Sequence, residues 1–307
     1  MPYVAVESID PPDLLATAER RWTTMSAARP DLQPAIDLQR ALLTTVVEVA
    51  ASIDRRRLPR LSLPPKYVAA KLSRGVPALA AEPIPVPAAA LTAPLVRLAR
   101  ELAAGGAADA ADHIRSAIET GAVDAASLLA ASLARDQDAI RQGAVHRGLS
   151  PDLVWLVAEL AVSPFAHALQ RGLFTPAAAP IALALDRWAS GYCPACGSWP
   201  ALAEVAGGHR ILRCSFCAAG WELNSYACIY CDESGEPFVT AAPDEERKDR
   251  RVEVCSACGG YLKTIDVAEL SPFPLLAIAD LETMDLDVAA MERGYARPPL
   301  KTFTARR

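Results

Sequence analysis

All eight cysteines of the chain lie within one stretch of 66 residues, and each belongs to a pair of the form C-x2-C. A tight turn lets the two thiolates of one pair bind one side of a tetrahedral ion, and a second pair, brought over by a hairpin, completes the shell. The pattern therefore predicts two metal sites of four thiolates each. Their ligands would be Cys193, Cys196, Cys214, Cys217, Cys228, Cys231, Cys255 and Cys258.

The spacing between the pairs indicates which cysteines share an ion. Seventeen residues separate Cys196 from Cys214, and twenty-three separate Cys231 from Cys255. The first gap is typical of zinc ribbons, and the second is slightly longer. We expect the first two pairs to form one site and the last two pairs to form the other. The middle gap has only ten residues, so interleaved pairing is an alternative.

Two other uses of the cysteines compete with metal binding. Thiol redox pairs also have the C-x2-C form, but no thioredoxin-like alternation of strands and helices surrounds any pair. Structural disulfides require an oxidising compartment, and the N-terminus "MPYVAVESID" lacks the basic flank and apolar block of a secretory signal. We therefore expect a cytoplasmic protein with reduced cysteines.

The residue after each pair also bears on the fold, because a metal knuckle commonly needs a left-handed residue there. Gly197 and Gly259 follow two pairs and suit that conformation, and Asp232 tolerates it. Ala218 tolerates it less well, so we expect its knuckle to be looser or to turn nearer Gly220. Sulfur-only tetrahedral sites suit zinc or iron, and the spacing does not choose between the two metals.

Residues 1–186 contain no cysteine and are rich in alanine, which favours helix. Apolar residues at helical spacing predict a helical bundle, and the proline-rich segment 77–94 is expected to be a long loop on its surface. Pro164 is expected to end or kink the helix that begins near Ser150. The expected helices cover 11–28, 33–53, 93–104, 107–119, 122–134, 150–163 and 175–189.

The pattern changes near Trp188, where short β-prone pieces replace helical spacing. The predicted fold is mainly α. A helical domain over 1–186 is followed by two small rubredoxin-like or zinc-ribbon modules over 187–226 and 227–270. A C-terminal helix and tail over 271–307 end the chain, and the helix itself is expected at 274–293. Trp221 and Tyr261 are expected to shield the metals.

Charge argues against nucleic acid as a partner. The chain carries a formal charge of −5, and 191–265 holds ten acidic residues against seven basic ones. Phosphate binding requires the opposite sign. Membrane insertion is not expected either, because the longest weakly charged stretch, 76–96, contains five prolines.

No residues outside the cysteine pairs suggest catalysis. His113, His146 and His167 are isolated on expected helices, and His209 lies near a shell that four cysteines already complete. The mixed-charge run 244–250 is interpreted as a solvated loop. We expect no enzyme activity. A homo-oligomer is compatible with the sequence.

The cysteine region resembles the formate dehydrogenase accessory proteins of the FdhE type. The resemblance is carried by "DRWASGYCPACGSWP", "ILRCSFCAAGWELNSYACIYC", "CSACGGYLKTID" and "DLETMDLDVAAMERGYARP", and it covers about 187–297. It implies a cytoplasmic protein that binds the catalytic subunit of formate dehydrogenase and is needed for its assembly into active enzyme. It also implies rubredoxin-like sites that hold two iron ions through the eight cysteines. Zinc is the alternative metal, especially in recombinant protein.

A rubredoxin-like electron carrier or redox-sensing metal protein is the alternative function. Iron held by two C-x2-C pairs can transfer one electron, but a carrier needs only the small modules. The electron-carrier function would leave the long helical part unexplained, so the accessory role is preferred.

Overall fold

The computed structural model describes residues 3–7, 9–55, 63–242 and 248–303. The chain divides into two compact units. The cysteine unit comprises 1–8, 62–80 and 170–303, and the helical unit comprises 9–61, 81–169 and 304–307. This division differs from the contiguous helical domain predicted over 1–186, because three segments of that range, 1–8, 62–80 and 170–186, belong to the cysteine unit.

The helical unit consists of helices joined mostly by short connections, except that the chain between α2 and α4 passes through the cysteine unit. Most predicted helices are present, and α7 is an addition that the sequence patterns did not indicate. The break at Gly105-Gly106 is also present, and Gly106 has a φ of 115° that only glycine adopts readily. The helices are α1 (Pro11–Ala28), α2 (Gln33–Arg55), α4 (Ala88–Leu102), α5 (Ala108–Glu119), α6 (Ala125–Leu133), α7 (Gln137–His146) and the larger part of α8 (Pro151–Phe174).

Helix α8 passes through Pro164, so this proline does not end the helix, which was one of the two outcomes predicted for it. Proline removes one backbone hydrogen bond from a helix interior. The helix nevertheless buries apolar side chains on both sides of the proline, including Val157, Val162 and Phe165. Burial of these side chains offsets the lost bond. By length and composition α8 could also cross a membrane, although 56% of its most apolar window is buried inside the protein, as in a core helix.

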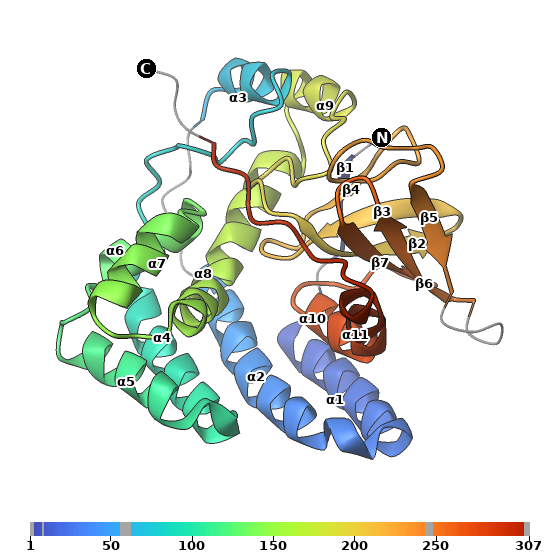
Figure 1. Ribbon diagram of the computed structural model, residues 1–307. Helices are drawn as coiled ribbons and strands as arrows, with labels where there is room; N and C mark the ends of the chain where they lie inside the picture. The colour runs from blue at the N-terminus through green and yellow to red at the C-terminus, as the bar shows by residue number, and fades with distance from the viewer. Residues whose placement is uncertain (1–2, 8, 56–62, 243–247, 304–307) are drawn as a thin grey trace. The chain divides into compact units, whose positions relative to one another are not determined.

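The cysteine unit is built on a seven-stranded sheet in the order β1-β4-β3-β2-β7-β6-β5 (Figure 1). The predicted mainly α fold is thus confirmed only in part, because the chain contains this sheet in addition to its helices. The strands are β1 (Tyr3–Val4), β2 (Pro200–Ala206), β3 (His209–Cys214), β4 (Gly220–Glu222), β5 (Phe238–Ala241), β6 (Arg250–Cys255) and β7 (Gly260–Asp266).

The two cysteine modules repeat one topology and share the sheet. Strands β2, β3 and β4 form an antiparallel ribbon, and β5, β6 and β7 form a second one in the same order. The ribbons join where β2 runs parallel to β7, with Leu202 opposite Lys263. An isolated ribbon would leave the N–H and C=O groups of this edge unpaired. Pairing the two edges fuses the predicted separate modules into one body.

Segments far from the cysteines in sequence complete the cysteine unit. Strand β1 adds to β4, with Tyr3 opposite Trp221. Helices α3 (Pro65–Leu72) and α9 (Ala179–Leu185) contact each other. The segment 77–94 is only in part the predicted surface loop, because residues 78–80 are buried and α4 begins at Ala88. The Nζ atom of Lys71 donates hydrogen bonds to the carbonyls of Ala78 and Ala80, which holds this buried turn.

Two short helices replace the single C-terminal helix predicted over 274–293. They are α10 (Leu276–Glu282) and α11 (Met284–Glu292), and they lie against the β6–β7 part of the sheet (Figure 1). Thr283 separates them with a φ of −114°, outside the helical region. Buried Lys263 on β7 forms ion pairs with Asp280 and Asp287, so the acidic residues of these helices fix them to the sheet.

Candidate metal centres

Each cysteine pair lies in a knuckle next to a strand of the sheet. The first knuckle precedes β2, the second joins β3 to β4, the third precedes β5 and the fourth joins β6 to β7. In three of them the carbonyl of the first cysteine accepts a hydrogen bond from the N–H four residues later, at 2.8–2.9 Å. The sheet register therefore sets the position of each thiol pair.

The residue after each pair adopts the left-handed conformation in all four knuckles. Its φ is 83° at Gly197, 56° at Ala218, 64° at Asp232 and 69° at Gly259. The chain turns at Ala218, so the predicted alternative of a turn nearer Gly220 is wrong. A left-handed alanine costs about 1–2 kcal/mol. Its side chain is buried against the sheet core, which offsets part of this cost.

The eight sulfurs form two groups of four. The first two cysteine pairs form one group and the last two pairs form the other, as the spacing predicts, so interleaved pairing is excluded. Within each group all sulfurs lie within 4.8 Å of one another. In the first group Cys193 and Cys217 are 3.6 Å apart and Cys196 and Cys214 are 3.5 Å apart. In the second group, Cys228 to Cys258 and Cys231 to Cys255 measure 3.6 and 3.7 Å. All eight cysteines are free of disulfide bonds.

These distances fit a bound ion. A tetrahedral ion with metal–sulfur bonds of about 2.3 Å needs sulfurs about 3.8 Å apart, whereas a disulfide needs about 2.05 Å. Burial raises the pKa of Cys193 and Cys217, so these thiols hold their protons in the absence of a cation. A metal ion reverses that preference, because its charge stabilises thiolate. The two clusters could therefore hold one metal ion each.

Backbone donors and aromatic rings complete the first cluster. The N–H groups of Phe216 and Cys217 both donate to the Cys214 sulfur at 3.4 Å. Trp221 is fully buried and its Nε1 donates to the carbonyl of Ser190, just before the first knuckle. At the second cluster, the Tyr230 hydroxyl donates to the carbonyl of Tyr261 at 2.9 Å, and the Tyr261 hydroxyl donates to Asp287. Rigid aromatic contacts thus position the knuckles of both clusters.

Buried ion pairs tie the sheet together, and the sequence patterns did not identify them. Arg213 on β3 and Glu204 on β2 pair with both side chains fully buried. Arg210 on the first ribbon pairs with Glu253 on the second. One signal was available: each charge interrupts an otherwise apolar strand, as in "ALAEVA" and "ILRC".

None of the four histidines is a ligand in the four-sulfur groups. His209 begins β3, is exposed, and contacts Glu222 at 3.1 Å. His113, His146 and His167 lie on α5, α7 and α8. The mixed-charge run at 244–250 falls mainly outside the described residues, which resume at Lys248.

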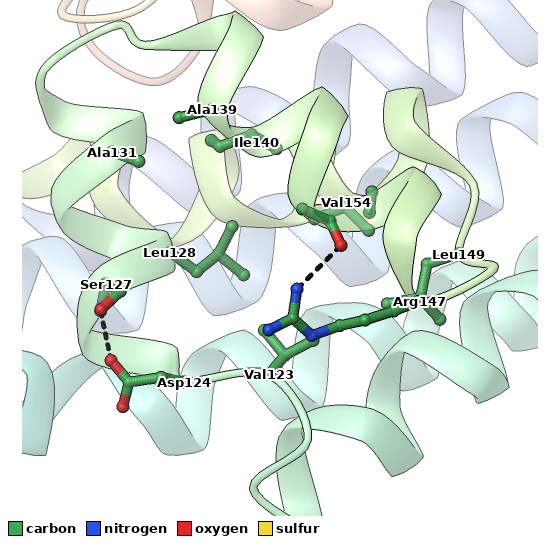
Figure 2. A pocket seen from close by; sticks show the side chains of 12 residues that line it. Val123, Asp124, Ser127, Leu128, Ala131, Ala139, Ile140, Arg147, Leu149 and Val154 are labelled. Carbon is green, nitrogen blue, oxygen red and sulfur yellow. Dashed lines mark hydrogen bonds between the residues drawn. The ribbon is translucent and has the colours of Figure 1, made fainter.

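The helical unit contains a cavity of about 280 Å³ between α6 and α7 (Figure 2). Its lining is mostly apolar. Asp124 accepts a hydrogen bond from the N–H of Ser127 and so caps α6. Arg147 donates to the carbonyls of Ala122 and Gly143. Both charged side chains that line this cavity therefore form hydrogen bonds with backbone groups.

Similarities to known proteins were found in sequence and in fold. No family model matches the chain. The chain is 32% identical over 124 residues to a protein FdhE homolog of Aquifex aeolicus, a match that covers 36% of this chain and 41% of that protein. It is 34% identical over 116 residues to a protein FdhE homolog of Haemophilus influenzae, covering 36% of this chain and 38% of that protein. The matches thus span well under half the length of these relatives.

The fold is similar over nearly the whole chain to a solved structure. The crystal structure of the FdhE protein from Pseudomonas aeruginosa superimposes with a TM-score of 0.61 and 22% identity, and the match covers 97% of both chains. This likeness shows the fold, and the matched segments of the relatives add sequence identity above 30%. The chain therefore has the fold of that FdhE protein, and part of it is similar in sequence to FdhE homologs.

Proposed function

We propose that the chain is an accessory protein that binds the catalytic subunit of formate dehydrogenase in the cytoplasm and is needed for its assembly into active enzyme. The observation that carries the proposal is the presence of two complete four-thiol clusters in a chain with an FdhE fold. Its action is protein–protein contact, not catalysis. The partner and the compartment come from the resemblance of the cysteine region to FdhE-type proteins.

In this proposal each cluster binds one metal ion through its four cysteines, and the ion is iron. Iron held by four thiolates can gain or lose one electron, whereas zinc cannot. The chain's own residues fix the sulfur positions, because each pair is built into a knuckle that precedes a strand or joins two strands. The fused sheet then presents both clusters on one rigid body, which suits a surface that must fit a large partner.

Capture of the catalytic subunit by the full chain tests the proposal. Wild type, Cys193→Ser/Cys196→Ser and Cys228→Ser/Cys231→Ser would be compared for retention of the subunit and for formate dehydrogenase activity in cells that lack the native protein. We expect each double variant to lose one metal ion by elemental analysis and to capture less subunit. Unchanged capture and unchanged enzyme activity in both variants would rule out a role for the clusters.

The rubredoxin-like electron carrier is the second candidate, because two cysteines of the second cluster are exposed. Anaerobically purified protein distinguishes the two functions. A red protein that exchanges electrons rapidly with a reductase and does not capture the subunit would favour the carrier.

A further inference from the structure

The two clusters differ in their access to solvent. All four cysteines of the first cluster are buried. In the second cluster Cys228 and Cys255 are buried, but Cys231 and Cys258 are exposed. An ion in the second cluster would therefore be held by two buried cysteines and two exposed ones.

The first cluster is sealed by three segments distant in sequence. The N–H groups of Ala78 and Leu79 donate to the carbonyls of Pro194 and Ala195, at 2.8 and 2.9 Å, so residues 78–79 cover the turn of the first knuckle. Trp221, which pairs with Tyr3 across β1 and β4, is fully buried.

The C-terminal segment adds the third cover. Phe303 lies so close to Gly197 that a methyl group there would be 2.5 Å from its ring. Next to it, Trp199 Nε1 donates to the carbonyl of Pro299 at 2.9 Å. Reaching the first cluster thus requires the protein to open.

The second cluster has much less cover. Apart from its own chain neighbours, no atom of the described residues lies within 4 Å of a methyl group placed on Gly259, which follows the fourth cysteine pair as Gly197 follows the first. The chain neighbours of the two exposed cysteines are exposed as well, namely Asp232, Ser256 and Ala257. Strand β5, which leads away from the third knuckle, is at the edge of the sheet and three of its four residues are exposed. Two knuckles with the same backbone conformation therefore differ in what covers them.

We propose that the first cluster is a permanent structural metal site and that the second is an exchangeable one, open to incoming ligands. The inference rests on the proposed binding of one ion by each cluster. An incoming chelator replaces the sulfurs of Cys231 and Cys258 first and those of Cys228 and Cys255 next. The ion leaves with its charge unchanged, the freed thiolates take up protons from water, and no electrons are transferred. Release from the first cluster requires local unfolding before any ligand can enter.

Zinc release from the full chain tests the inference. Protein loaded with two zinc ions is mixed with excess of a chelator that absorbs light when it binds zinc, such as 4-(2-pyridylazo)resorcinol. We expect two phases of equal amplitude, with the faster at least about tenfold faster than the slower, because each 1.4 kcal/mol of opening free energy slows release about tenfold. Iodoacetamide added after the fast phase, followed by mass spectrometry, should label the four cysteines of the second cluster alone.

Matched variants assign the phases. Cys231→Ser/Cys258→Ser should abolish the fast phase and keep the slow one, and Cys196→Ser/Cys217→Ser should abolish the slow phase. Release of both ions in one phase, or labelling of the first cluster before the second, would overturn the inference and leave the proposed metal binding intact. Protein that binds no zinc at all would overturn both.

Discussion

Gly191 lies against the backbone of Ile229 so closely that a methyl group on it would be 1.9 Å from the Ile229 carbonyl oxygen. Gly191 leads into the first knuckle, and Ile229 stands between the two cysteines of the third. The approach therefore joins the two metal modules at a point other than the β2–β7 pairing. Only glycine fits, because the obstacle is backbone and cannot change rotamer.

Gly191→Ala should separate the first knuckle from the third. We expect the free energy of unfolding to fall by about 1–3 kcal/mol or more, because overpacking a well-packed interior usually costs this much. Thermal unfolding of the metal-loaded protein measures it. Gly172→Ala on α8 is the control, because no described atom lies within 4 Å of its added methyl group. Alanine is also the better helix former, so this variant should be neutral or slightly more stable. Equal midpoints for the two variants would contradict the close approach.

The Arg213–Glu204 pair should behave as a buried ion pair. Arg213→Met leaves the Glu204 carboxylate buried, with the N–H of Ser271 as a remaining donor. We expect the free energy of unfolding to fall by about 3–5 kcal/mol, because the buried charge loses its partner. Adding Glu204→Gln removes the stranded charge and should restore part of that loss. Urea unfolding of the two single variants and the double variant measures the coupling. A double variant whose loss equals the sum of the single losses would show that the charges do not interact.

Stability should fall at alkaline pH through Tyr3. Burial raises the pKa of Tyr3 to about 12, whereas the unfolded chain releases this proton near pH 10. Between these values the folded state holds more protons, so its stability is complete below about pH 10 and is lost as the pH rises towards 12, by up to about 2–3 kcal/mol. Unfolding midpoints measured from pH 8 to 11.5 should decline less steeply in Tyr3→Phe. Tyr67→Phe, which changes an exposed tyrosine on α3, should keep the wild-type slope.

The sequence was most informative where chemistry fixes geometry locally. Spacing alone grouped the cysteines correctly, because two residues between thiols define a knuckle and a gap of seventeen allows one hairpin. The left-handed residues at Gly197 and Gly259 followed from the same turn. Most helices were also found, because their apolar residues recur at helical spacing. Ala218 was misjudged because its burial in the sheet core, which is a tertiary effect, offsets an unfavourable backbone conformation.

Long-range pairing could not be predicted. The parallel register of β2 and β7 joins residues about sixty positions apart, and nothing local in either strand selects that partner. The same holds for Tyr3 beside Trp221 and for Ala78 bonded to the first knuckle. Lys263 could have been recognised from the sequence. A lysine inside the apolar run "YLKTI" must pair with an acidic residue if it is buried. Asp280 and Asp287 are the acidic residues that pair with it.

The C-terminal segment should control how fast the first cluster loses its metal. The Phe303 ring lies 5.1 Å from that of Tyr192 and against Gly197, so Phe303→Ala removes cover from the first knuckle. A partly exposed ring contributes about 1 kcal/mol here, which corresponds to about fivefold faster release in the slow phase of the zinc assay. The fast phase should not change, because the second cluster lies outside this contact. Met291→Ala, which removes an exposed apolar side chain from α11, should leave both phases unchanged. A slow phase unaffected by Phe303→Ala would mean that residues 78–79 and Trp221 seal the first cluster without the tail.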